Sequence, residues 1–387
     1  MTNDTKNVPE LRFPGFSGEW EIKELGNRVK FYSGLTYTPN DVSKNGTLVL
    51  RSSNIFNNHI INADNVYVNS DKATSTYVEY GDVVVVVRNG SRNLIGKHAV
   101  VKKEETNAVI GAFMTGIRYE FGSFINALLS TQNFQKEIHK NLGATINQIT
   151  TGIFKKMAFS FPKKQEEQKI GVFFSKLDRQ IELEEQKLEK LKEQKKGYMQ
   201  KIFSQEIRFK DDNGNDYPEW ESKKFLDIFK LAPSKNNQIK SSEVVENGII
   251  PVVDQGKDIF LGYSNEKDKA IEDFDNVIVY GDHTTIIKYI KEPFIIGGDG
   301  VKLLESNDGS LIHYLYILLQ YFNVKPEGYK RHYSILKNKM MNISNTKEEQ
   351  EKIGDFFNEL DELIEKQSSK IVVLKQRKKG FLQKMFV

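Results

Sequence analysis

Six loops of this chain combine the side-chain types that bind nucleic acid. Arg, Asn, Gln, Ser and Thr hydrogen-bond to base edges, and Arg and Lys also hold phosphates. Apolar runs that we interpret as buried elements precede these loops and would position them rigidly. The candidates in the first half are Arg51, Ser53, Asn54, Arg88, Asn89, Ser91, Arg92, Asn93, Lys97, Thr145, Asn147, Gln148 and Thr150. The candidates in the second half are Gln255, Lys257, His283, Thr284, Thr285, Lys288, Lys330, Arg331, His332 and Tyr333. The alternative interpretation is that these loops are ordinary solvated turns.

The sequence lacks the motifs that common nucleic-acid chemistries require. It has no Asn/Asp-Pro-Pro-aromatic motif for adenine methylation and no Gly-x4-Gly-Lys-Ser/Thr loop for ATP. It has no cysteine, and its six histidines lack the spacing of metal ligands. We therefore predict no catalytic, cofactor-binding or metal-binding residue in this chain. An enzyme with an unfamiliar motif is the alternative, and methylation or cleavage by the purified chain alone would favour it.

An internal duplication sets the organisation of the chain. Residues 168–178 match residues 351–361, and residues 195–203 match residues 378–386 at the same offset of 183. Between these duplicated segments the two halves share little sequence. The order is therefore variable block, constant segment, variable block, constant segment.

The constant segments carry apolar side chains at the 3.5-residue period of a coiled-coil seam. In the first copy the seam residues are Ile170, Phe174, Leu177, Ile181, Leu188, Leu191, Tyr198 and Ile202, and in the second copy they are Ile353, Phe357, Leu360, Ile364, Ile371, Leu374, Phe381 and Met385. Pro162 and a Thr346-x-x-Glu349 capping box indicate where the helices begin. Because each seam has a partner in the same chain, we predict an intramolecular antiparallel coiled coil. A homodimeric zipper is the alternative.

Polar residues interrupt both seams at equivalent positions and suggest a register. If Glu184 faces Lys378, then Lys195 faces Gln367, since both pairs of residue numbers sum to 562. A helix of about 35 residues is about 50 Å long, which corresponds to roughly 15 base pairs of duplex. Such a rod could hold two globules at separate patches of one DNA.

The variable blocks have the pattern of short strands and helices that is typical of small mixed domains. Short strands are predicted at 47–51, 66–68, 83–87, 98–101 and 117–119, and at 250–253, 277–280, 286–290 and 301–304. Helices are predicted at 124–141 and 309–322. The fold class is therefore α+β. It comprises two sheet domains, residues 1–160 and 205–343, and two helical spacers, residues 161–204 and 344–387, in a pseudo-twofold repeat.

Composition favours a soluble cytoplasmic protein. The chain has 387 residues, 28% of them charged, and a net charge of only +4, so nucleic-acid contacts should come from local patches. The absence of cysteine fits a reducing compartment. The polar start, Met1–Glu10, has no signal-peptide core, and the apolar stretch 311–322 is too short to span a bilayer. We expect no membrane partner.

The pattern as a whole resembles the specificity subunit of type I restriction-modification enzymes. The resemblance rests on the opening Arg12-Phe13…Glu19-Trp20, its echo Arg208-Phe209…Glu219-Trp220, and the duplicated Lys-Ile-Gly-x-Phe-Phe helices, and it covers essentially the whole chain. It implies two target-recognition domains that each read one half of a split double-stranded DNA site. It also implies two methyltransferase subunits that bring S-adenosylmethionine, and motor-nuclease subunits that use ATP and Mg²⁺, with no cofactor in this chain.

The resemblance also implies which loops read bases. Carried over by position, these are the loops after Val87, Leu142, Tyr280 and Gly328. The competing interpretation is a coiled-coil scaffold that assembles partners without reading sequence. Such a scaffold would bind any duplex weakly, with a strong dependence on salt.

Overall fold

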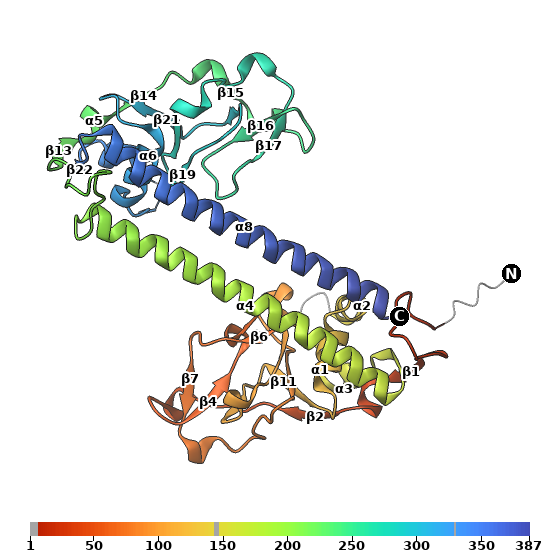
Figure 1. Ribbon diagram of the computed structural model, residues 1–387. Helices are drawn as coiled ribbons and strands as arrows, with labels where there is room; N and C mark the ends of the chain where they lie inside the picture. Colours follow the sequence, from red (N-terminus) through yellow and green to blue (C-terminus); the bar gives the residue numbers. More distant parts are fainter. Residues whose placement is uncertain (1–6, 143–146, 329) are drawn as a thin grey trace. The chain divides into compact units, whose positions relative to one another are not determined.

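The computed structural model describes residues 7–142, 147–328 and 330–387 and resolves them into two compact units. The first unit contains the chain up to Glu185 together with the segment from Ser369 onward, and the second contains Gln186–Ser368. Each unit holds one globule and parts of two long helices (Figure 1). The helix α4 spans Lys164–Phe203 and the helix α8 spans Lys347–Met385, as the seam period predicts.

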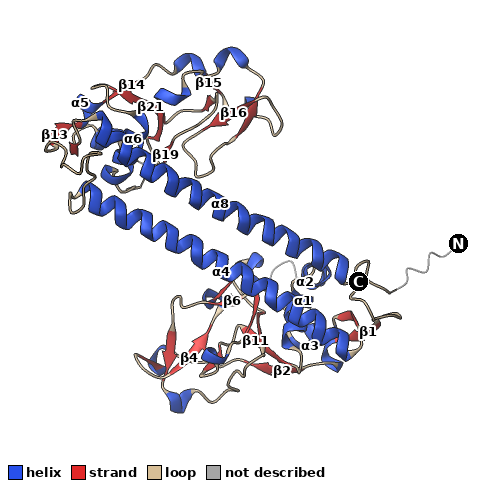
Figure 2. Ribbon diagram, viewed as in Figure 1, coloured by secondary structure: helices blue, strands red, loops and turns tan. Residues whose placement is uncertain are grey.

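In its described residues, the globule of the first unit contains short strands, three α-helices and short 3-10 turns (Figure 2). Its strands are β1 Glu21–Glu24, β2 Lys30–Ser33, β3 Val42–Ser43, β4 Thr47–Leu50, β5 Ile55–Phe56, β6 His59–Ile60, β7 Val66–Val68, β8 Val83–Val86, β9 His98–Val100, β10 Ala108–Ile110, β11 Met114–Arg118 and β12 Ala158–Phe161. Its helices are α1 Gly122–Leu129, α2 Gln132–Asn141 and α3 Thr151–Lys156. The main sheets have the orders β2-β11-β8-β9 and β10-β4-β7-β3.

The globule of the second unit is built in the same way. Its strands are β13 Glu221–Lys224, β14 Phe229–Leu231, β15 Gln238–Ile239, β16 Ile250–Val253, β17 Gly262–Ser264, β18 Ile278–Gly281, β19 Ile287–Lys288, β20 Ile295–Gly297, β21 Val301–Ser306 and β22 Met340–Ile343. Its helices are α5 Phe225–Ile228, α6 Ile312–Phe322 and α7 Tyr333–Leu336. The main sheets have the orders β14-β21-β18-β19 and β15-β20-β16-β17.

The two globules share one topology although their sequences differ. The antiparallel sheet β2-β11-β8-β9 corresponds strand by strand to β14-β21-β18-β19. Each second sheet contains a parallel pair, β10 with β4 in the first unit and β20 with β16 in the second. In both globules the first and last strands form an antiparallel pair, β1 with β12 and β13 with β22. The predicted α+β class is therefore confirmed, and the internal repeat extends to the divergent blocks.

Most predicted strands lie where expected, and the predicted helix 124–141 is divided into α1 and α2. The division occurs because the Thr131 side chain accepts a hydrogen bond from the Phe134 amide at 3.2 Å and starts a new helix. The edge pair β1–β12 was missed, since a sequence such as Glu21–Glu24 has too few apolar residues to indicate a strand.

The predicted capping box at the start of α8 is wrong. Among the described residues the Thr346 hydroxyl has no hydrogen-bond partner. The Glu349 carboxylate instead accepts hydrogen bonds from Arg208, Trp220 and Ser344. The helix dipole still stabilises a carboxylate in the first turn. The Glu349 carboxylate in addition links α8 to the globule through these three hydrogen bonds.

Several of the predicted seam residues are buried in the structure, whereas Tyr198 is exposed. Ile181, Ile371 and Leu374 are buried, and the outer seam positions join the globular cores. Ile170 and Phe174 lie in the core of the first unit, and Ile202, Ile353 and Phe357 lie in that of the second. Tyr198 is 41% exposed, although its ring packs edge-on against Phe356. In the described residues no helix is long and apolar enough to cross a membrane.

The predicted helix register does not match the ion pairs between the two helices. Lys378 pairs with Asp178, and Lys195 pairs with Asp361 at 2.7 Å, so both pairs of residue numbers sum to 556. These acidic residues directly follow the seam positions 177 and 360 and are equivalent in the repeat. The long lysine side chains reach these flanking carboxylates. Glu184, which the prediction placed opposite Lys378, pairs with Lys370 at 2.5 Å.

A buried histidine will make the stability of the first unit depend on pH. The Nδ1 atom of His98 lies 2.8 Å from the Gly96 carbonyl and its Nε2 atom lies 3.0 Å from the Ser130 hydroxyl. Burial lowers the pKa of His98 from 6.5 to about 4. His98 therefore takes up a proton near pH 6.5 in the unfolded chain but only near pH 4 in the folded chain. Between these pH values the unfolded state binds more protons, so the free energy of unfolding falls as the pH drops.

We expect a loss of about 2 kcal/mol from His98 between pH 7.5 and pH 5. Denaturant unfolding of the natural chain and of His98→Gln at both pH values will measure it. The natural chain should lose more stability on acidification than the variant. Equal losses in the two proteins would contradict the assignment.

Candidate nucleic-acid interface

The first unit brings its three predicted loops together at one end of its sheets. The Asn89 side chain donates to the Ser52 hydroxyl at 2.9 Å, and the Asn147 side chain donates to the Gly90 carbonyl at 2.9 Å. Arg88 forms an isolated antiparallel bridge with Gln148. The loops after β4, after β8 and before α3 thus form one surface. Thr145 lies outside the described residues.

A turn that sequence reasoning missed completes this surface. Residues 111–113 connect β10 to β11, and the Phe113 carbonyl accepts hydrogen bonds from the amides of Val87 and Arg88 at 3.0 and 3.1 Å. The guanidinium carbon of Arg88 lies 4.9 Å from the centre of the Phe113 ring. Since aromatic residues are usually buried, Phe113 gave no signal as a binding residue, yet it is 53% exposed.

Some predicted residues of the first unit are used within the protein. Asn54 is fully buried, and its side chain bonds to the Arg51 amide, the Ala63 carbonyl and the Asn65 side chain. Thr150 caps helix α3 through the Ile153 amide. The Arg51 guanidinium donates to the Asp64 carbonyl. The candidates that are exposed are Arg88, Ser91, Arg92, Asn93 and the helix-capping Thr150, with Arg51, Ser53, Asn89, Lys97, Asn147 and Gln148 partly exposed.

The second unit also gathers its predicted loops. The Gln255 side chain accepts a hydrogen bond from the His283 amide at 3.1 Å, and the Gln255 carbonyl accepts one from the Thr284 hydroxyl at 2.7 Å. The His283 Nδ1 atom lies 3.1 Å from the Lys330 carbonyl. The loops after β16, after β18 and before α7 therefore meet, at places equivalent to those of the first unit.

Three predicted residues of the second unit hold the loops rather than face solvent. His332 is fully buried, and its amide and Nδ1 both lie within 3.0 Å of the Asp282 carbonyl. Lys288 is buried and donates to the carbonyls of Asp254 and Asp258, while burial lowers its pKa. Thr285 is buried at a positive φ of 59°. The candidates that stay exposed are Lys257, Lys330 and Arg331, with Gln255, His283, Thr284 and Tyr333 partly exposed.

The family model for the type I restriction modification DNA specificity domain matches residues 17–193 and again residues 217–376. The chain belongs to this family. It is similar in fold to the S subunit of a type I restriction-modification system from M. genitalium, with a TM-score of 0.65 and 17% identity over 98% of this chain and 99% of that chain. A weaker likeness is to an HsdS subunit from Thermoanaerobacter tengcongensis, with a TM-score of 0.39 and 15% identity over 100% of this chain and 99% of that chain. Another is to a structure described as the basis of complex assembly and conformational transition of the type I R-M system, with a TM-score of 0.48 and 14% identity over 97% of this chain and 99% of that chain.

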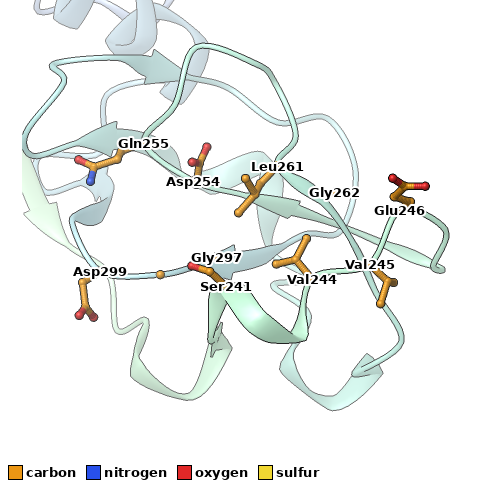
Figure 3. A pocket seen from close by; sticks show the side chains of 11 residues that line it. Ser241, Val244, Val245, Glu246, Asp254, Gln255, Leu261, Gly262, Gly297 and Asp299 are labelled. Atoms are coloured by element: carbon orange, nitrogen blue, oxygen red, sulfur yellow. The ribbon is translucent and has the colours of Figure 1, made fainter. Parts of the chain in front are cut away.

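The two specificity domains present different chemistry at matched positions. The residue after β4 is Arg51, and the residue after the equivalent strand β16 is Asp254. In the first domain a pocket of about 590 Å³ is lined by Arg51, Asp64 and Phe113 among others. In the second domain a pocket of about 490 Å³ at the same place is lined by Glu246, Asp254 and Asp299 (Figure 3). One of these carboxylates, Asp254, pairs with the buried Lys288 at 3.4 Å, and the two pockets differ in the charged groups that line them.

The shared opening of the two specificity domains anchors each globule to a long helix. Arg12 donates two hydrogen bonds of 2.7 Å to Glu166, in the first turn of α4. Arg208 contacts the equivalent Glu349, in the first turn of α8, at 3.2 Å. Both glutamates are buried. The Arg-Phe…Glu-Trp echo in the sequence was therefore a structural signal, although the sequence did not reveal its carboxylate partners.

Within the described residues no group of three or more His, Asp or Glu side chains could hold a metal ion. The polar surface of each domain is instead made of donors and acceptors on short loops. Such loops can form hydrogen bonds to the edges of bases and to phosphates.

Proposed function

We propose that this specificity chain reads a bipartite target in double-stranded DNA, one half with each domain. The observation that carries the proposal is a common topology with unlike side chains at matched loop positions. Arg51 corresponds to Asp254, and Arg88 corresponds to His283. Equal scaffolds with different donors and acceptors would read different base sequences. The target would therefore be asymmetric.

We also propose that the chain is a non-catalytic subunit that docks two copies of a methyltransferase. Its duplicated helices, in residues 161–204 and 344–387, offer two similar surfaces to one kind of partner. S-adenosylmethionine would come with those subunits, and ATP and Mg²⁺ with motor-nuclease subunits. The recognition domains would be residues 1–160 and 205–343, and a DNA target would place the assembly in the cytoplasm.

Selection of bound duplexes from a randomised library by the purified full chain tests the DNA-reading proposal. We expect two short conserved half-sites separated by a fixed gap. A scaffold that does not read sequence would instead enrich no motif, and its affinity for all duplexes would fall steeply with salt. Methylated or cleaved library DNA after incubation of the chain alone with S-adenosylmethionine or Mg²⁺ would contradict the non-catalytic role.

A further inference from the structure

Arg88 differs from the ion-paired arginines of the first unit. Those arginines are Arg12, Arg28, Arg118 and Arg179, and each has a carboxylate partner. Within the described residues no carboxylate pairs with Arg88, whose side chain is exposed. Its charge is therefore free to meet an external acceptor.

The Phe113 ring holds this free guanidinium in place. The ring centre is 4.9 Å from the guanidinium carbon, and the Phe113 carbonyl also accepts the Arg88 amide at 3.1 Å. The strand bridge to Gln148 fixes the Arg88 backbone from another side. A ring that is half exposed gains little from burial, but a cation resting on an aromatic face is stabilised. The arrangement thus orients a donor before any ligand arrives.

A planar guanidinium held in a fixed orientation suits one base in particular. Guanine presents two acceptors, O6 and N7, in the major groove, and arginine binds both of them through parallel hydrogen bonds. Orientation before binding also reduces the entropy that is lost on association. We propose that Arg88 reads a guanine in the half-site of the first domain, and that Phe113 is the positioning residue for this specificity. This inference rests on the proposed DNA-reading function.

The second domain does not contain this pair. By strand register, His283 occupies the place of Arg88, and Gly300 occupies the place of Phe113. The backbone bond is retained, because the Asp282 amide donates to the Gly300 carbonyl at 2.7 Å as the Val87 amide does to Phe113. The aromatic support is replaced by glycine. The guanine preference should therefore appear in one half of the target only.

The test is the same library selection with the full chain carrying Arg88→Ala, Phe113→Ala, Phe113→Tyr or Lys44→Ala. Arg88→Ala and Phe113→Ala should both reduce the preference for guanine roughly tenfold, at the same position of one half-site. Phe113→Tyr keeps an aromatic face and should retain the preference. Lys44, an exposed cation of the first unit outside the predicted DNA-binding loops, is the control, and Lys44→Ala should leave the guanine preference intact.

The outcomes separate this inference from the proposed function. If the natural chain enriches a bipartite motif and Phe113→Ala enriches the same motif with the same guanine preference, the role of Phe113 is refuted and DNA reading stands. If the natural chain enriches no motif, both proposals fail. Thermal unfolding of each variant checks that the half-exposed ring has been removed without loss of the fold. Loss of preference in both half-sites would also overturn the inference.

Discussion

A chimera that carries residues 221–346 in place of residues 21–163 should read the second half-site twice. The expected target has the second half-site in both halves, and the original first half-site no longer contributes. Each mismatched base pair costs about 1 to 3 kcal/mol. With about three such positions in a half-site, affinity for the natural target should fall roughly a thousandfold. Library selection and titration with the natural target duplex will measure both effects.

The structure supplies junctions that leave the long helices intact. The exchanged segment carries both strands of the pair that closes each globule, β1 with β12 or β13 with β22. It leaves Trp20 and the helix start Lys164 in place, which match Trp220 and Lys347. The two helices also offer the same receiving surface, because Gly171 and Gly354 occupy equivalent positions.

These glycines show why the helix surfaces are interchangeable. A Cβ atom on Gly171 would lie 2.7 Å from the Phe124 amide nitrogen, and one on Gly354 would lie 1.9 Å from the His313 ring. Both glycines thus permit a helix of the globule to approach closely. The reciprocal chimera, with residues 21–163 in place of 221–346, is the matched control and should read the first half-site twice. A folded chimera that still selects the natural asymmetric target would contradict reading by separate domains.

The sequence predicted those elements whose signal is local. The run Val83–Val86 is β-branched and fully apolar, and it forms a buried strand. The seam period likewise predicted α4 and α8, because a repeat over many turns can hardly arise without a helix. The register of the two helices was not predictable in this way. In the structure, Asp178 and Asp361 flank the seam and pair with lysines that reach across from the other helix, and the seam period does not indicate these pairs.

The roles of single polar residues were harder to predict because burial decides them. Asn54 and His332 have the side chains of base readers, but both are buried with their hydrogen bonds satisfied inside the protein. Lys288 holds a loop through two backbone carbonyls. The error for Phe113 is the opposite one. An apolar side chain indicates a core residue, but Phe113 is 53% exposed. Only the folded turn between β10 and β11 places it beside Arg88.

The last phenylalanine of each repeated segment connects the constant helices to the variable globules. Phe203 ends α4 and lies in the core of the second unit, with Trp220, Tyr314 and Phe357 around its ring. Its equivalent, Phe386, contacts Trp20 and Phe124 in the first unit. A helix that begins in one unit thus completes the core of the other. This explains why the repeat keeps both aromatic residues, the tryptophan at its start and the phenylalanine at its end.

Phe203→Ala should therefore destabilise the second unit by about 3 to 5 kcal/mol, the usual cost of removing a buried phenylalanine. Leu183→Ala is the matched control on the same helix, since Leu183 is 48% exposed, and it should cost less than about 1 kcal/mol. Denaturant unfolding of the full chain, with hydrogen exchange to locate the change, will measure both. The increased exchange should lie in residues 186–368. If Phe203→Ala were as stable as Leu183→Ala, the helix end would not be part of the globular core, and the constant segments would act as spacers alone.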